Sequence, residues 1–199
     1  MEYVIQFFSE YKQFFTIAHV FFVIMGMGAA MVSDVLFNVY IKNKKINPTE
    51  NKTLEVLSRI IWISLGLIVL SGMALFFSNP GFYMQSAKFL VKMSIVLVII
   101  LNGFLFWKIT HASLKEINFT DTNSNHKYVR IRKLSFAFGA VSLVSWLSVF
   151  LLGSIRSIQL SFSYAILLYV IIIIFVILGS QIVEYIITHP RDLSKKKKV

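Results

Sequence analysis

Five long apolar stretches, separated by polar segments, set the hydrophobic pattern of this chain. Each stretch is long enough to supply the roughly 20 helical residues that cross the hydrocarbon core of a bilayer. None has the continuous polar face of a helix at the surface of a soluble protein. The pattern predicts an all-α integral membrane bundle of five transmembrane helices, forming a single membrane domain, at about 14–41, 57–78, 88–109, 134–155 and 160–187.

The connecting segments alternate in length. The segments at about 42–56 and 110–133 are long and polar, whereas those at about 79–87 and 156–159 are short. Short connections join antiparallel neighbours, so we expect an up-and-down bundle. The sequence Asn47-Pro48-Thr49 predicts a turn and a helix start, and Pro80 and Gly81 predict the end of the second helix.

Composition supports a lipid environment. Hydrophobic residues make up 57% of the chain and charged residues 15%, compared with about 45–50% and about 25% in soluble domains. Cysteine is absent, which excludes disulfide bonds and thiolate metal sites within the chain. The sequence also lacks a phosphate-binding glycine loop, an HExxH pattern and a nucleophile elbow, so it carries no motif of a known enzyme class.

The basic residues predict the orientation of the bundle. Of the 20 lysines and arginines, 16 fall around the first and third connections and the C-terminal tail, and cytoplasmic loops retain such residues during insertion. We therefore expect the N-terminus outside and the C-terminus in the cytoplasm. This topology accounts for the net charge of +11 without nucleic-acid binding, and the basic tail at 188–199 is expected to contact anionic lipid headgroups.

Polar residues toward the cytoplasmic ends of the predicted helices form an inner layer. Ionisable groups at membrane depth cost about 2.5–3.5 kcal/mol each on insertion scales, which makes them functional candidates. Asp34 and Asn102 are predicted at matching depths, and an ion pair between Asp34 and Arg59 is the least costly arrangement. The layer either ties helices together or makes Asp34 and Glu184 a proton or cation site reached from the cytoplasm. Its members are Asp34, Arg59, Asn102, Gln181 and Glu184.

A second, cationic layer is predicted near the outer ends of the helices. It combines His19, which should face into the bundle, with the basic side chains of Lys88, Lys92 and Arg156. An imidazole for iron and cations for propionates are what a b-type haem requires. His111, His126 and His189 belong to the other side, so the sixth position would be Met73, Met93 or open. The alternative is a neutral imidazole hydrogen-bonded to a serine or a backbone carbonyl.

Two further patterns have structural interpretations. Met25, Met27 and Met31 could supply thioether ligands for copper(I), but they point in different directions and methionine commonly fills irregular cores. The fourth stretch carries small residues and a tryptophan along one stripe, which is typical of a helix contact in lipid. The stripe consists of Ser135, Gly139, Ser142 and Trp146.

Several short motifs carry a resemblance to known families. The chain resembles an uncharacterised group of small polytopic bacterial membrane proteins, and it is loosely similar to copper-resistance D-type and predicted haem-binding membrane proteins. The first resemblance implies a multi-pass protein of the bacterial inner (plasma) membrane, and the second implies haem or copper binding. The first is carried by Ser33-Asp34, Leu57-Ser58, Ile61-Trp62, Leu70-Ser71-Gly72, Leu75-Phe76, Lys88-Phe89-Leu90-Val91-Lys92, Asn102-Gly103, Ser145-Trp146 and Gln181-Ile182-Val183-Glu184, and the second by His19-Val20, Ser71-Gly72 and Lys88.

Three functions from different classes follow from these patterns. The first is a haem-binding redox protein that uses His19 to hold haem b. The second is a small proton- or cation-coupled transporter that uses Asp34 and Glu184. The third is a non-catalytic membrane subunit that assembles with copies of itself or with a membrane protein partner through an exposed small-residue face, such as the stripe from Ser135 to Trp146.

Overall fold

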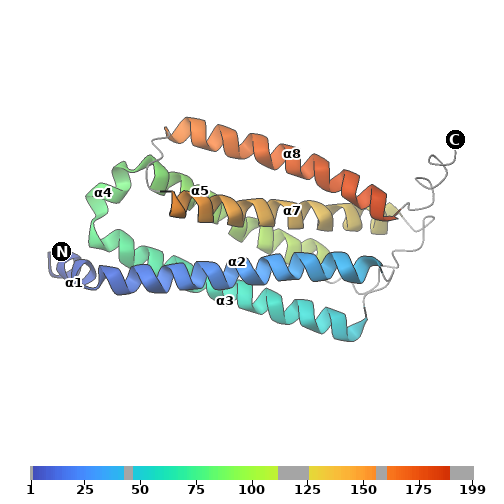
Figure 1. The fold of residues 1–199 in the computed structure, drawn as a ribbon, viewed down its shortest axis with the longest axis horizontal. Helices are drawn as coiled ribbons and strands as arrows, with labels where there is room; N and C mark the ends of the chain where they lie inside the picture. The colour runs from blue at the N-terminus through green and yellow to red at the C-terminus, as the bar shows by residue number, and fades with distance from the viewer. Residues whose placement is uncertain (1, 43–46, 112–125, 156–160, 189–199) are drawn as a thin grey trace.

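The computed structural model describes residues 2–42, 47–111, 126–155 and 161–188, and these residues are almost entirely helical. The tail at 188–199 lies outside them except for its first residue, so its lipid contacts stay a prediction. Figure 1 shows the elements in chain order. They are α1 (Glu2–Glu10), α2 (Lys12–Lys42), α3 (Pro48–Ser78), α4 (Pro80–Gln85), α5 (Ala87–Phe106), the π-helical turn η1 (Trp107–His111), α7 (His126–Ser154) and α8 (Phe162–Thr188).

The prediction of an all-α bundle with five membrane-spanning helices is confirmed. Five helical segments of the described residues are long and apolar enough to cross a bilayer, at Lys12–Tyr40, Pro48–Ser78, Ala87–Ile109, Val129–Ser154 and Phe162–Ile187. Successive spans run in opposite directions, so the described chain starts at one end of the bundle and finishes at the other (Figure 1). The up-and-down topology is therefore confirmed, and the protein is a multi-pass membrane protein. Which end faces the cytoplasm stays a prediction.

Two spans begin earlier in the chain than the apolar pattern predicted. α3 starts at Pro48 rather than near residue 57, and α7 starts at His126 rather than near residue 134. Proline suits the first turn of a helix, and the backbone N–H of Asn47 donates to Glu50 Oε2 at 2.7 Å. This cap uses polar groups outside the apolar stretch. α3 therefore begins before the part of the helix that must be apolar to lie in lipid.

Two short helices lie at the end of the bundle where the chain begins. α4 starts at Pro80, and its first turn is capped by Asn79 Oδ1, which accepts from the N–H of Phe82 at 3.2 Å. α1 packs on the bundle through Phe8, whose ring stacks on Phe77 of α3 with centroids 5.9 Å apart. Neither segment is a continuous apolar run long enough to cross lipid, and the sequence pattern predicted neither helix.

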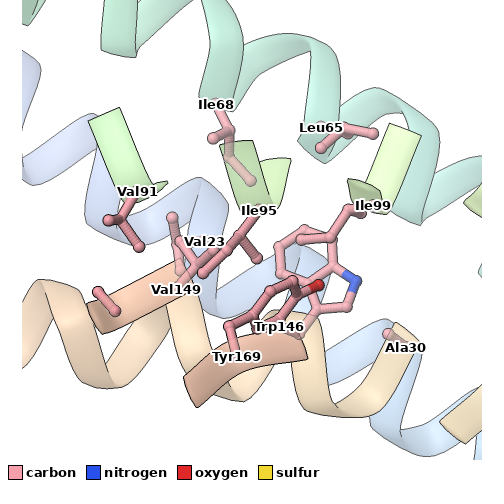
Figure 2. Close-up of a cluster of buried hydrophobic side chains, with 11 residues drawn as sticks. Val23, Ala30, Leu65, Ile68, Val91, Ile95, Ile99, Trp146, Val149 and Tyr169 are labelled. Carbon is pink, nitrogen blue, oxygen red and sulfur yellow. The ribbon is translucent and has the colours of Figure 1, made fainter. Parts of the chain in front are cut away.

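Buried apolar side chains from all five spans meet in one central cluster (Figure 2). Trp146 of α7 lies in its middle and is only 2% exposed. A second cluster near the C-terminal end of α8 surrounds the buried side chains of Ile131 and Phe136. α8 packs against α7 and α5 and leaves most of its surface exposed to the surrounding lipid. The central cluster consists of Val23, Ala30, Leu65, Ile68, Val91, Ile95, Ile99, Trp146, Val149, Ala165 and Tyr169.

Small residues let α2 and α7 approach closely. A Cβ atom on Gly26 of α2 would lie 2.8 Å from Cη2 of Trp146 and 3.0 Å from Cβ of Ser64. Both distances are shorter than van der Waals contact, so glycine is required for the present packing. Because Trp146 and Gly139 of the predicted stripe both meet α2, the prediction that this stripe marks a helix contact is confirmed.

Candidate functional site

Asp34 of α2 lies against the backbone of α7. Its Oδ1 atom is 3.2 Å from the position that a Cβ atom on Gly139 would occupy, so the absence of a side chain there makes room for the carboxyl group. Its Oδ2 atom is buried and makes no hydrogen bond with the described residues. An acceptor buried without a partner costs about 1–3 kcal/mol, and more if it is charged, so this oxygen is an expensive feature of the bundle.

Asn102 of α5 lies at the same level. Its Nδ2 atom donates to the carbonyl oxygen of Phe138 at 3.0 Å, and Phe138 precedes Gly139, the residue that Asp34 contacts. The prediction that Asp34 and Asn102 lie at matching depths is therefore confirmed. Asp34 and Asn102 contact neighbouring residues of the same helix, so both side chains pack against α7.

The predicted ion pair between Asp34 and Arg59 is wrong. Arg59 is exposed, and Asp34 Oδ2 has no partner among the described residues. At 100° per residue, Arg59 lies about 140° around α3 from Ser64, which belongs to the buried face of that helix. The depth of Arg59 was compatible with pairing, but the rotation of α3 directs the residue away from α2.

Glu184 of α8 has a different partner. It is 2% exposed and forms an ion pair with Arg132 of α7, whose side chain is 7% exposed. Sequence reasoning missed Arg132 because it was counted as a loop residue outside a span starting near 134. Its spacing carried a signal, because Arg132 lies seven residues before Gly139 and 14 before Trp146, which places it on the same stripe of α7.

The inner layer thus divides into two levels along α7. Arg132 and Gly139 are seven residues apart, which is about 10 Å of helix. Gln181 belongs to the first level, where its Nε2 atom donates to the carbonyl oxygen of Lys133 at 3.2 Å. Between the levels lies the buried hydroxyl of Ser135, which donates to the carbonyl oxygen of Ile131 at 2.9 Å. Asp34 and Glu184 therefore line one stripe of α7 without sharing a site.

Aromatic side chains pack beside this stripe. The rings of Phe37 and Phe136 meet edge to face with centroids 6.0 Å apart, and Tyr40, Phe106 and Ile187 complete the second apolar cluster. Phe37 follows Asp34 by one turn of α2. The cluster therefore separates the carboxyl group of Asp34 from the end of the bundle at which α2 and α8 finish.

His19 of α2 is held by α3. Its Nδ1 atom lies 2.9 Å from Oγ of Ser71, and its ring packs on Gly72, where a Cβ atom would lie 3.4 Å from Cε1. Ser71 Oγ also lies 2.7 Å from the carbonyl oxygen of Leu67, to which it donates. A hydroxyl has one proton, so while Ser71 donates to Leu67 it can only accept from His19. Nδ1 then carries the hydrogen of the neutral ring, and Nε2 keeps a lone pair.

The remaining members of the predicted outer layer are only partly assembled. Lys92 is half-buried and lies within electrostatic range of His19. Lys88 donates from Nζ to the carbonyl oxygen of Ile155, just after α7. Arg156 lies outside the described residues. Met73 and Met93 are about half exposed on the outside of the bundle, so neither is directed toward His19 as a sixth ligand would be.

The described residues contain no group of three histidine, aspartate or glutamate side chains that could hold a metal ion. Met25 and Met27 are half-buried, whereas Met31 is exposed, so the three thioethers lie in different environments. The side chains of His111 and His126 and the whole of His189 are not described. Of the four histidines, His19 is the one whose side chain the structure describes.

Comparison with models of known families, with curated proteins and with solved structures found no match to this chain. The resemblances noted from short motifs therefore stay predictions, and the functional argument rests on the side chains themselves.

Proposed function

We propose that this protein is a small proton- or cation-coupled transporter in which Asp34 takes up and releases the coupling ion. The observation that carries the proposal is the Oδ2 atom of Asp34, buried between spans with no hydrogen-bond partner among the described residues. An ionisable residue at membrane depth is retained at a cost, and such residues mark ion pathways in pumps and transporters. A proton, a cation or a water molecule would supply the missing partner.

The stripe on α7 suggests the route by which the ion arrives. Arg132 and Glu184 hold each other nearest the predicted cytoplasmic end, Ser135 lies about one turn farther along, and Gly139 with Asp34 follows after another turn. Glu184 is a positioning residue in this scheme, because Arg132 already neutralises it. The aromatic cluster around Phe37 and Phe136 would have to open for ions to reach Asp34.

Asp34→Asn tests the proposal because it removes the titrating group and keeps the shape of the side chain. In proteoliposomes with an internal pH dye or cation indicator, we expect the wild-type protein to dissipate an imposed gradient and Asp34→Asn to lose that flux. Glu10→Gln, which alters an exposed carboxylate of α1, is the matched control and should retain it. An equal flux in wild type and Asp34→Asn, or no wild-type flux for protons or alkali cations, would overturn the proposal.

A haem-binding role for His19 is the second candidate. The hydrogen bond from Nδ1 to Ser71 favours it, because histidines that ligate metals usually donate their other ring hydrogen to a fixed acceptor. Iron would bind Nε2, with Lys92 as the nearby cation for a propionate. The haem would supply one-electron redox chemistry, and the chain would orient the imidazole through Ser71. A subunit is the third, but its partner would have to bind a face other than the stripe from Ser135 to Trp146, because both of these residues are buried within the bundle.

A further inference from the structure

A groove runs between α7 and α8 at the end of the bundle where α8 finishes. Its volume is about 430 Å³, and its walls come from residues 129–137 of α7 and 177–181 of α8. Two basic residues, Arg130 and Lys133, lie along its α7 side. Leu134, Ala137 and Ile177 form its apolar part, and Gln181 also lines it, at the level of Lys133.

The two basic residues are available to a ligand. Arg130 and Lys133 are exposed, and within the part of the chain that the structure describes neither pairs with a carboxylate. Their neighbour Arg132 is different, because it is buried and paired with Glu184. Considering the described residues alone, the groove therefore presents two positive charges that no carboxylate pairs with, next to an apolar surface.

The position of the groove in the span fixes the kind of occupant. Arg130 and Lys133 lie in the first turns of α7, just before the apolar stretch that starts near residue 134, so they lie at the level where the bilayer meets water. Ala137 lies about 6 Å deeper, one turn beyond Lys133. Charge at the interface and apolar surface below it match a phospholipid, with a phosphate above and an acyl chain beneath. Basic pockets between helices on the cytoplasmic side of a membrane recognise anionic headgroups in this way.

We propose that the groove between α7 and α8 is a binding site for an anionic phospholipid. Arg130 and Lys133 contact the headgroup phosphate, and one acyl chain lies along Leu134, Ala137 and Ile177. A zwitterionic lipid of the same chain length fits the apolar part but gains less from the two charges. This site does not depend on ion transport by Asp34.

Native mass spectrometry of the purified protein, titrated with phosphatidylglycerol or with phosphatidylcholine of identical chains, tests the site. We expect phosphatidylglycerol to bind the wild type more tightly, and Arg130→Gln/Lys133→Gln to weaken that binding by roughly tenfold or more. The matched control is Lys52→Gln/Lys108→Gln, which removes two exposed charges from the same end of the bundle but outside the groove. It should bind as the wild type does.

A second variant tests the acyl chain separately from the charges. Ala137→Phe fills the apolar part of the groove and should lower phosphatidylglycerol binding without a change in charge. Inorganic phosphate, added as a competitor, should displace little lipid, because it cannot use the apolar surface. Equal binding of both lipids, an equal loss in the control pair, full displacement by phosphate, or unchanged binding in Ala137→Phe would each overturn the proposal.

Discussion

At the scale of single residues, one hydroxyl proton determines the state of His19. Ser71 donates that proton to Leu67 and so must accept from Nδ1. These contacts hold the ring in one orientation and favour the tautomer in which Nε2 can accept a proton or bind a metal. A small change at Ser71 should therefore alter the chemistry of His19 without removing the histidine.

His19 yields a spectroscopic prediction under the haem proposal. Protein purified in detergent and supplied with haem b should show a Soret band that is absent in His19→Ala. Ser71→Ala removes the acceptor that orients the ring and should weaken haem binding by about 10–100-fold. His111→Ala, which changes a histidine in η1 directly after the C-terminal end of α5, is the control. A colourless wild-type preparation after haem supplementation would contradict the prediction.

The depths of the polar residues could be predicted from the sequence, but their partners could not. Counting 1.5 Å per residue from the basic boundaries placed Asp34 and Asn102 at one depth, and their contacts with Gly139 and Phe138 agree. The partner of Asp34 could not be derived in the same way. Depth says nothing of the rotation of each helix about its axis, and that rotation directs Arg59 outward.

At the scale of elements, α7 connects the bundle. It contacts α2, α5 and α8, and its backbone carbonyls accept from side chains on two of them, at Phe138 from Asn102 and at Lys133 from Gln181. The buried pair of Arg132 and Glu184 adds a charged link to α8. α8 buries only a narrow stripe of its surface, so this link should matter greatly for its attachment.

Arg132 and Glu184 should therefore show strong coupling. Arg132→Met takes a buried guanidinium away from the Glu184 carboxylate, and Glu184→Gln takes away the carboxylate that pairs with buried Arg132. Each change should lower the free energy of unfolding by about 3–5 kcal/mol. Arg132→Met/Glu184→Met removes both charges and should cost less than either single change. Unfolding in mixed micelles followed by circular dichroism measures the cycle, with exposed Arg59→Gln, outside the groove between α7 and α8, as the control. Additive losses in the double variant would contradict the coupling.

The five long helices were predictable because lipid imposes length and apolar composition on any span. The ends of α3 and α7 and the short helices α1 and α4 were less accessible. They depend on local caps, such as Asn79 for α4, and on contacts such as Phe8 with Phe77. Neither effect leaves a long apolar signature in the sequence.

At the scale of the whole molecule, the distribution of lysine and arginine predicts which end of the bundle lies in the cytoplasm. The chain lacks cysteine, so single cysteine variants can report accessibility without background labelling. Lys52 in α3 and Met84 in α4 are exposed at opposite ends of the bundle. In right-side-out spheroplasts, a membrane-impermeant maleimide should label Met84→Cys directly and Lys52→Cys only after permeabilisation. The reverse result would invert the topology.

The two close contacts between α2 and α7 limit how the bundle can move. Gly26 receives Trp146, and Gly139 receives Asp34, eight residues apart on α2 and seven apart on α7. Two anchors about 10–12 Å apart prevent both rolling and axial slip between these helices. Because α2 also packs closely on α3 through Gly26 and Ser64, a rearrangement that exposes Asp34 to water must carry α2, α3 and α7 as one rigid body, and the gap must open against α5 or α8.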